Sequence, residues 1–198
     1  TGVGFSCEKA ETEQLPSIPE IIRNEDEIIT IEDSRRGWAD GYGLLLHYLY
    51  KGIHPTWDTG LIRPKGTRLK TFGGRASGPE PLEKLFKFTV NLFYKNQEGR
   101  LSSIDVHDII CMIGEIVISG GVRRSALISL SDLDDREMAK AKSGAWWEAS
   151  GHRSLSNNSA VYESKPSLGR FMEEWGLLYD SKSGERGICN REAMNTIA

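Results

Sequence analysis

The stretch Ser119-Gly-Gly-Val-Arg-Arg-Ser-Ala-Leu-Ile-Ser-Leu130 is the most informative part of this chain. Its two glycines allow the backbone to bend closely around a ligand. Its two arginines carry rigid forks of donors that suit a phosphate or a base edge. The apolar residues that follow predict a buried strand. The pattern therefore indicates a cationic, nucleotide-binding loop anchored on a strand, although a helix-to-strand turn with two solvated arginines also fits.

A second basic segment covers residues 59–79 and contains no acidic residue. Its five basic side chains are Arg63, Lys65, Arg68, Lys70 and Arg75. Because the whole chain has a net charge of −3, this is a real local asymmetry. Glycines at 60, 66, 73, 74 and 78 let backbone amides approach an anion. A triphosphate is the natural ligand for such a loop, and a solvated basic loop is the alternative.

Composition places the chain among soluble globular proteins. It has 198 residues, of which 27% are charged and 38% hydrophobic, which is enough for one domain with a core. The net charge predicts no nucleic-acid partner. No apolar run has membrane-spanning length and no signal peptide opens the chain, so we expect a cytoplasmic protein. Because the chain lacks an initial Met and stops inside a predicted helix, we expect an internal fragment of a longer protein.

The three cysteines and the histidines give little sign of a metal or disulfide site. Cys7, Cys111 and Cys189 are far apart and odd in number, which favours a reducing compartment. Cys111 falls on the apolar side of a predicted helix. Three of the four histidines lack partners at the spacing of metal ligands: His47, His54 and His152.

Helices and strands alternate along the chain, which predicts an α/β fold. Asp33 or Ser34 caps a helix whose apolar face is Trp38, Tyr42, Leu45 and Leu49. Ser102-Ser-Ile-Asp105 has the form of a capping box, so it begins a helix that runs to Ile118. Asp132 or Asp134 begins a short helix. Strands are expected at 1–7, 27–31, 126–130 and 155–162, and an extended segment at 56–62. Further helices are expected at 80–96 and around 168–178. The second of these helices has one apolar face: Leu168, Phe171, Met172, Trp175 and Leu178.

Several motifs, in order along nearly the whole chain, resemble the monomeric, adenosylcobalamin-dependent ribonucleotide reductases. The longest is Arg63-Pro-Lys-Gly-Thr-Arg-Leu-Lys-Thr-Phe-Gly-Gly-Arg-Ala-Ser-Gly-Pro-Glu-Pro-Leu82, and the 119–130 stretch resembles the specificity loop of that family. The others are Thr1-Gly-Val-Gly-Phe-Ser6, Asp33-Ser34, Gly37-Trp38, Asn157-Asn-Ser-Ala-Val-Tyr162 and Ser181-Lys-Ser-Gly-Glu-Arg-Gly187.

The resemblance implies part of a ten-stranded α/β barrel, with residues 1–198 inside the catalytic barrel domain. It also implies a helical insert at 8–58 that mimics a dimer partner, so that the enzyme is a monomer. The parent oxidoreductase would reduce ribonucleoside triphosphates to deoxyribonucleotides by thiyl-radical chemistry with adenosylcobalamin. It would take a deoxyribonucleoside triphosphate effector and a thioredoxin-like reductant.

The resemblance also implies roles for individual residues. Asp33, Ser34, Arg63, Lys65 and Arg68 would bind the effector. Gly120, Gly121, Val122, Arg123, Arg124 and Ser125 would form the substrate-specificity loop, with Arg123 at the substrate base. Arg36 stands where the family usually has an acidic residue.

No catalytic residue is expected within the chain, because none of the three cysteines matches the radical cysteine or the reducing pair. His107 and Asp108 resemble a recurrent pair of the family, for which helix packing or capping is the simpler role. Asn157 and Asn158 could position a ligand or bond at a strand entry. A nucleotide-binding regulatory module without chemistry of its own is the alternative function.

Overall fold

The computed structural model describes all residues except 1, 70–73, 120–125 and 198. The chain divides into two compact units. The first contains the described residues of 1–14, 102–114 and 125–198, and the second contains those of 15–101 and 115–124. The long helix α4 (Ser103–Ser119) therefore contributes residues to both units.

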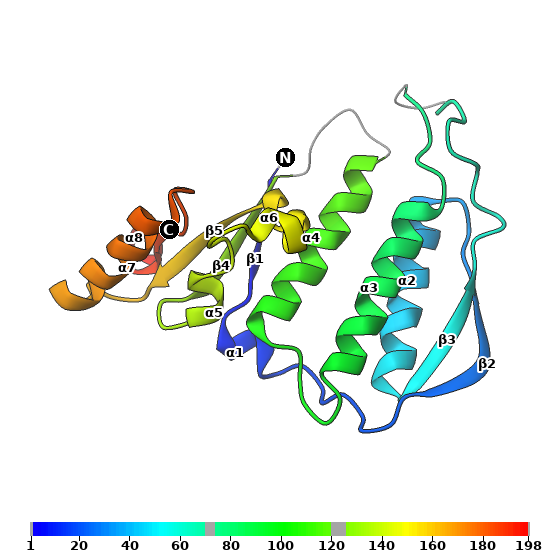
Figure 1. Ribbon diagram of the computed structural model, residues 1–198, viewed down its shortest axis with the longest axis horizontal. Helices are drawn as coiled ribbons and strands as arrows, with labels where there is room; N and C mark the ends of the chain where they lie inside the picture. The colour runs from blue at the N-terminus through cyan, green and yellow to red at the C-terminus, as the bar shows by residue number, and fades with distance from the viewer. Residues whose placement is uncertain (1, 70–73, 120–125, 198) are drawn as a thin grey trace. The chain divides into compact units, whose positions relative to one another are not determined.

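The first unit is built on a parallel sheet with the strand order β1-β4-β5-β6 (Figure 1). The strands are β1 (Val3–Ser6), β4 (Leu127–Asp132), β5 (Ser156–Tyr162) and β6 (Gly187–Asn190). Each successive strand is added next to the previous one, always in parallel. Helices α1 (Lys9–Thr12), α5 (Arg136–Ala139), α6 (Trp146–Ser150), the 3-10 helix η1 (Gly151–Leu155), α7 (Leu168–Ser181) and α8 (Arg191–Ile197) lie between or after the strands.

The start of α4 confirms the capping box. The Ser102 backbone N–H donates to Oδ2 of Asp105 over 3.1 Å, and the Asp105 N–H donates to Oγ of Ser102 over 3.3 Å. These two bonds satisfy donors that a helix N-terminus leaves open. The expected start of the following short helix was wrong: Asp135, rather than Asp132 or Asp134, caps α5 by accepting from the Met138 N–H over 2.9 Å.

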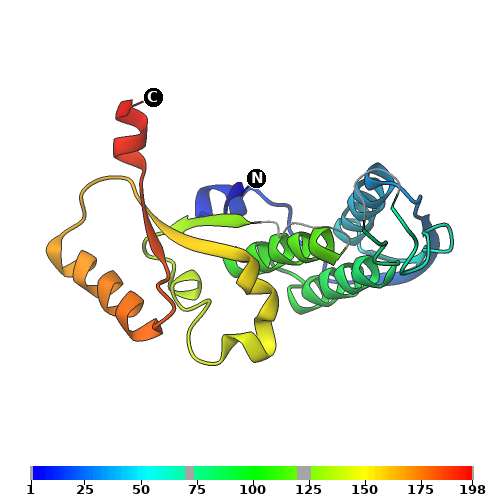
Figure 2. The same cartoon turned by 90° about the horizontal axis from the view of Figure 1, so that it is seen from above.

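Helix α7 forms as expected, but its apolar face is not buried in this unit. Met172 and Trp175 are about half exposed, and Leu168 and Tyr179 are more exposed still. The buried side chain of α7 is Glu174, which accepts from Arg186 over 2.6 Å. Figure 2 shows β6 leading from the end of α7 to α8.

The second unit contains a parallel pair of strands, β2 (Arg23–Thr30) and β3 (Ile53–Asp58), joined through helix α2 (Arg35–Tyr50). Helix α3 (Glu80–Lys95) packs on α2. The expected extended segment at 56–62 lies about three residues too late, because the strand begins at Ile53 and the chain turns after Asp58. The core side chains include Ile29, Ile31, Leu45, Leu49, Leu82, Phe86 and Phe93.

Two glycines allow α2 to lie close to the chain that enters it. A Cβ at Gly37 would lie 2.6 Å from the Glu32 carbonyl oxygen, and a Cβ at Gly41 would lie 3.2 Å from Ile31. On the other side, Tyr42 reaches α3 and bonds with Thr89 over 3.0 Å. This packing fixes the N-terminus of α2, where Asp33 and Ser34 lie.

Candidate functional site

Ser34, rather than Asp33, caps α2. Its Oγ accepts from the Gly37 N–H over 2.9 Å, and its backbone is extended, as a capping residue requires. The Ser34 hydroxyl can still donate its own proton to a ligand. Helix N-termini favour anions, because their amides and dipole point outward.

Arg63 and Asp33 meet at this helix end, although 30 residues separate them. Arg63 donates from Nε to Oδ2 of Asp33 over 2.6 Å, and the two side chains are 38% and 32% exposed. The bond engages one of the five N–H donors of the guanidinium. The structure therefore brings together two residues that the sequence predicted for one site, and it leaves both within reach of solvent.

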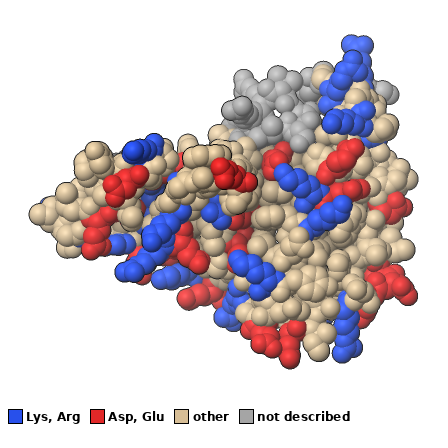
Figure 3. All heavy atoms as spheres, viewed as in Figure 1, with Lys and Arg blue, Asp and Glu red and all other residues tan. Residues whose placement is uncertain are grey.

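The basic loop after Arg63 forms a short hairpin. Arg68 and Arg75 pair in an antiparallel bridge, and Gly66 and Ala76 are joined by a backbone bond of 2.9 Å. Positive φ values of 91°, 87° and 81° at residues 66, 74 and 78 require glycine there. The loop rises from the end of the unit where α2 and α3 begin, and Figure 3 shows Lys and Arg side chains at the upper right, where the described part of this loop lies.

The structure describes only some of the residues predicted to bind nucleotides. Lys65 and Arg68 are exposed on the hairpin, and the Cβ of Lys65 lies against Gly78, where an added Cβ would meet it at 3.1 Å. Lys70 lies outside the described residues. So does the whole predicted specificity loop of Gly120, Gly121, Val122, Arg123, Arg124 and Ser125.

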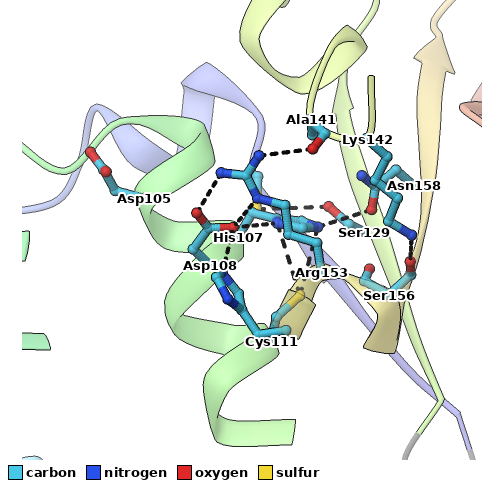
Figure 4. Close-up of polar contacts among 12 residues, drawn as sticks. Asp105, His107, Asp108, Cys111, Ser129, Ala141, Lys142, Arg153, Ser156 and Asn158 are labelled. Atoms are coloured by element: carbon cyan, nitrogen blue, oxygen red, sulfur yellow. Dashed lines mark hydrogen bonds and ion pairs between the residues drawn. The ribbon is translucent and has the colours of Figure 1, made fainter. Parts of the chain in front are cut away.

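The second polar cluster is buried in the first unit, between α4, η1 and β5 (Figure 4). Arg153 donates from Nε and Nη2 to the two carboxylate oxygens of Asp108, over 2.7 and 2.6 Å, and from Nη1 to the Ala141 carbonyl over 2.8 Å. His107 contacts Asp108 through Nδ1 at 3.2 Å and Oδ1 of Asn158 through Nε2 at 2.9 Å. We call Asp108, Arg153, His107 and Asn158 the α4 anchor.

The electrostatics of the α4 anchor favour an ionised Asp108. Burial alone would raise the pKa of Asp108, but hydrogen bonds from His107, His152 and Arg153, together with the charge of Arg153, outweigh it. The net result holds the pKa of Asp108 well below its usual value. Next to the anchor, Lys142 donates to the Ser156 carbonyl and to Oε1 of Glu185, the latter over 2.6 Å. The sequence suggested packing or capping for His107 and Asp108, but it gave no sign that Arg153 would pair with them.

Two of the three cysteines of the first unit, Cys7 and Cys111, are buried and are poor nucleophiles. Desolvation by burial raises the pKa of both Cys7 and Cys111 to about 12. Cys111, on α4, is buried in the core, as its position on the apolar side of the predicted helix indicated. Its sulfur lies 3.7 Å from Nε2 of His107. Since the thiolate is the reactive form, neither group is prepared for thiol chemistry near neutral pH.

One small cavity lies in the first unit. The cavity lined by Met138, Lys142, Asn158, Ser181 and Glu185, among others, has a volume of about 10 Å³, which suits roughly one water molecule. Among the described residues, no group of three or more His, Cys, Asp or Glu side chains could hold a metal ion. None of the described helices is long and apolar enough to cross a membrane.

Comparison with known proteins places these features in a family. Residues 13–93 match the family model for the insertion domain of B12-dependent ribonucleotide reductase. The chain is similar to the adenosylcobalamin-dependent ribonucleoside-triphosphate reductase of Lactobacillus helveticus, with 34% identity over 169 residues that cover 81% of this chain and 22% of that protein. A probable enzyme of the same name from Dictyostelium discoideum is 36% identical and covers 86% of this chain and 22% of its own length.

A solved structure agrees with the sequence relatives. The crystal structure of a B12-dependent (class II) ribonucleotide reductase superposes with a TM-score of 0.68 and 25% identity, over 82% of this chain and 27% of that one. The chain belongs to the adenosylcobalamin-dependent ribonucleotide reductase family. It spans about a quarter of the length of the relatives that it matches.

Membership of this reductase family confirms the resemblance that the motifs suggested, and the parallel α/β sheet confirms the coarse fold class. The matched insertion-domain range, 13–93, begins five residues later and ends well after the 8–58 segment expected from the sequence. The bounds of that segment and the roles of the individual effector residues stay predictions.

Proposed function

We propose that this chain is the allosteric-control segment of an adenosylcobalamin-dependent ribonucleoside-triphosphate reductase. The parent enzyme would replace the ribose 2′-hydroxyl of a nucleotide by hydrogen, through a thiyl radical and with electrons from a thioredoxin-like protein. In this proposal the chain forms part of the ten-stranded barrel and of the insert that mimics a dimer partner. The alternative, a regulatory module without chemistry, is not favoured by relatives that are named as reductases.

In this proposal, adenosylcobalamin is bound mostly by residues of the parent enzyme outside this chain. The cavity of about 10 Å³ is far too small for a corrinoid, and we assign no described residue to adenosylcobalamin and no step of the reaction to this segment. What the segment supplies is binding and orientation. The raised pKa of Cys7 and Cys111 agrees with this assignment, because it leaves both thiols unsuited to the redox steps.

The Arg63–Asp33 contact carries the proposal for the effector. In the proposed complex, Arg63 and Lys65 bind the triphosphate of a deoxyribonucleotide, with Arg68 as a further contact, while Asp33 and Ser34 face its ribose or base. The 2.6 Å ion pair supports this because it joins the two predicted halves of one site in a single chain. Guanidinium groups bind phosphate through paired, charge-assisted bonds.

The test is a titration of deoxynucleotide effector against the full-length enzyme. Arg63→Ala should weaken effector binding about tenfold or more, because a charge-assisted bond contributes about 1.5–3 kcal/mol. Arg23→Ala is the matched control, since Arg23 is an exposed arginine at the opposite end of β2 from α2. Equal dissociation constants for wild type and Arg63→Ala would instead support the alternative interpretation, in which this segment is a solvated basic loop.

We also propose that the enzyme works as a monomer. Asp33 and Arg63 bond within one chain, so this pairing requires no helix from a neighbouring subunit. Sedimentation of the full-length enzyme with effector should give a monomer. A stable dimer whose interface contains residues 33–49 would refute the single-chain effector site.

A further inference from the structure

The chain on both sides of segment 120–125 is tied to the same strand, β5. On the C-terminal side, β4 pairs with β5, with Leu127 opposite Ser156 and Ser129 opposite Asn158. On the N-terminal side, α4 ends at Ser119 and reaches β5 through the 2.9 Å contact between His107 and Asn158. Asn158 therefore lies in register with β4 and also holds α4.

Arg153 adds a second connection between α4 and the start of β5. It lies in η1, which leads directly into β5 at Ser156, and it bonds to both oxygens of Asp108 on α4. Its third bond, to the Ala141 carbonyl, fixes the guanidinium from another direction. Such a fork cannot follow a helix that shifts by one residue, because that shift moves the backbone by about 1.5 Å.

Stability alone is a weak reason to bury these charges. A buried ion pair must overcome the desolvation of both ions, and well-packed apolar residues often do as well. The side chains of Asp108 and Arg153 are only 12% and 17% exposed. The pair adds two directional bonds, which favour one position of α4 along and about its axis.

We propose that Arg153 is a positioning residue for substrate selection. It acts through Asp108 by fixing the position of the C-terminal end of α4, from which the chain continues into segment 120–125. The inference rests on the proposed function, in which that segment selects the substrate. Arg153 itself touches neither substrate nor effector in this scheme. Its loss should change which substrate is preferred more than it changes how tightly the effector binds.

The experiment uses the full-length enzyme and the variant Arg153→Lys, which keeps the charge but loses the fork. Ribonucleoside triphosphates compete as substrates in the presence of each deoxynucleotide effector. We expect the effector-dependent preference ratio to fall about threefold or more, with nearly unchanged effector affinity. Glu174→Gln is the control, because it weakens another buried arginine pair, Glu174–Arg186, which lies between α7 and the start of β6.

Preference ratios that stay at the wild-type value in Arg153→Lys, or that fall equally in Glu174→Gln, would overturn the inference. If Arg153→Lys does not fold, Asn158→Ala decides in the same way, since it removes the 2.9 Å contact with His107. Hydrogen exchange of residues 119–126 gives a readout without turnover: it should become faster in Arg153→Lys but not in Glu174→Gln. A wild-type enzyme whose preference ignores every effector would instead refute the proposed function.

Discussion

Two of the arginine–carboxylate pairs of the chain have the same length but lie in very different surroundings. Arg63 meets Asp33 at 2.6 Å with both side chains more than 30% exposed, while Arg153 meets Asp108 at 2.6 Å with both below 20%. The exposed pair contributes about 0–1 kcal/mol and can exchange its partner for a ligand. The buried pair cannot open without leaving an uncompensated charge. One geometry therefore suits binding and the other suits positioning.

The largest expected effect distinguishes the two pairs by stability. Asp108→Ala should lower the free energy of unfolding by about 3–5 kcal/mol, because it leaves Arg153 without its carboxylate. Asp33→Ala should lower it by about 0–1 kcal/mol, because Arg63 is solvated. Urea unfolding of the purified variants measures both. Similar losses in the two variants would mean that burial does not separate the pairs in the way proposed.

Acid should destabilise the folded chain through the buried pair. The folded-state pKa of Asp108 is depressed, so its contribution to stability is fully present above the unfolded pKa of about 3.9 and declines as pH falls below it. Asp108→Asn removes this titration. The free energy of unfolding should therefore fall less steeply below about pH 4 in Asp108→Asn than in wild type, as denaturant titrations at several pH values would show. Parallel curves would argue that folding does not lower the pKa of Asp108.

The local elements were largely predictable because their signals are short-range. The capping box at Ser102–Asp105 and the cap at Ser34 follow from neighbouring residues, and both are present. Asp135 was missed as the cap of α5 because three aspartates lie within four positions and only the fold selects among them. The exposure of the apolar face of α7 could not be predicted either, since a helical pattern shows which residues share a face but not what covers that face.

The site was predictable in its parts but not in its contacts. Family motifs marked Asp33 and Arg63, yet only the packing of α2 and the turn after β3 bring them to 2.6 Å. Arg153 was not singled out at all, because its partner Asp108 is 45 residues away and no local pattern links them. Buried polar pairs depend on tertiary structure, and a single sequence gives little information about which distant residues will pair.

Arg123 offers a smaller and more specific effect than the buried pair. It lies in the segment that the family resemblance links to both effector and substrate, outside the described residues. Arg123→Ala should abolish much of the effector's influence on substrate choice, a coupling of about 1–3 kcal/mol, while effector affinity changes less. Substrate competition in the full-length enzyme measures this. If every substrate slows equally and the preference pattern survives, Arg123 does not link the two sites.

The smallest expected effect concerns Arg36, which lies at the same helix end as the exposed pair. Arg36 contacts Asp40 at 3.2 Å, with the two side chains 89% and 61% exposed. Arg36→Ala loses this pair, about 0.3–0.5 kcal/mol, but it also removes a cation from the positive end of α2, which returns about 0.3–1 kcal/mol. Stability should thus hardly change.

Effector titration then separates two origins of binding at this helix end. If the fork of Arg63 holds the triphosphate, Arg36→Ala should weaken the effector by less than about threefold, since an exposed side chain acts only through a screened field. Arg63→Ala should cost about tenfold or more under the same conditions. Equal losses in the two variants, both relieved by added salt, would mean that the summed positive charge of the region attracts the effector and that the contact with Asp33 gives Arg63 no special geometry.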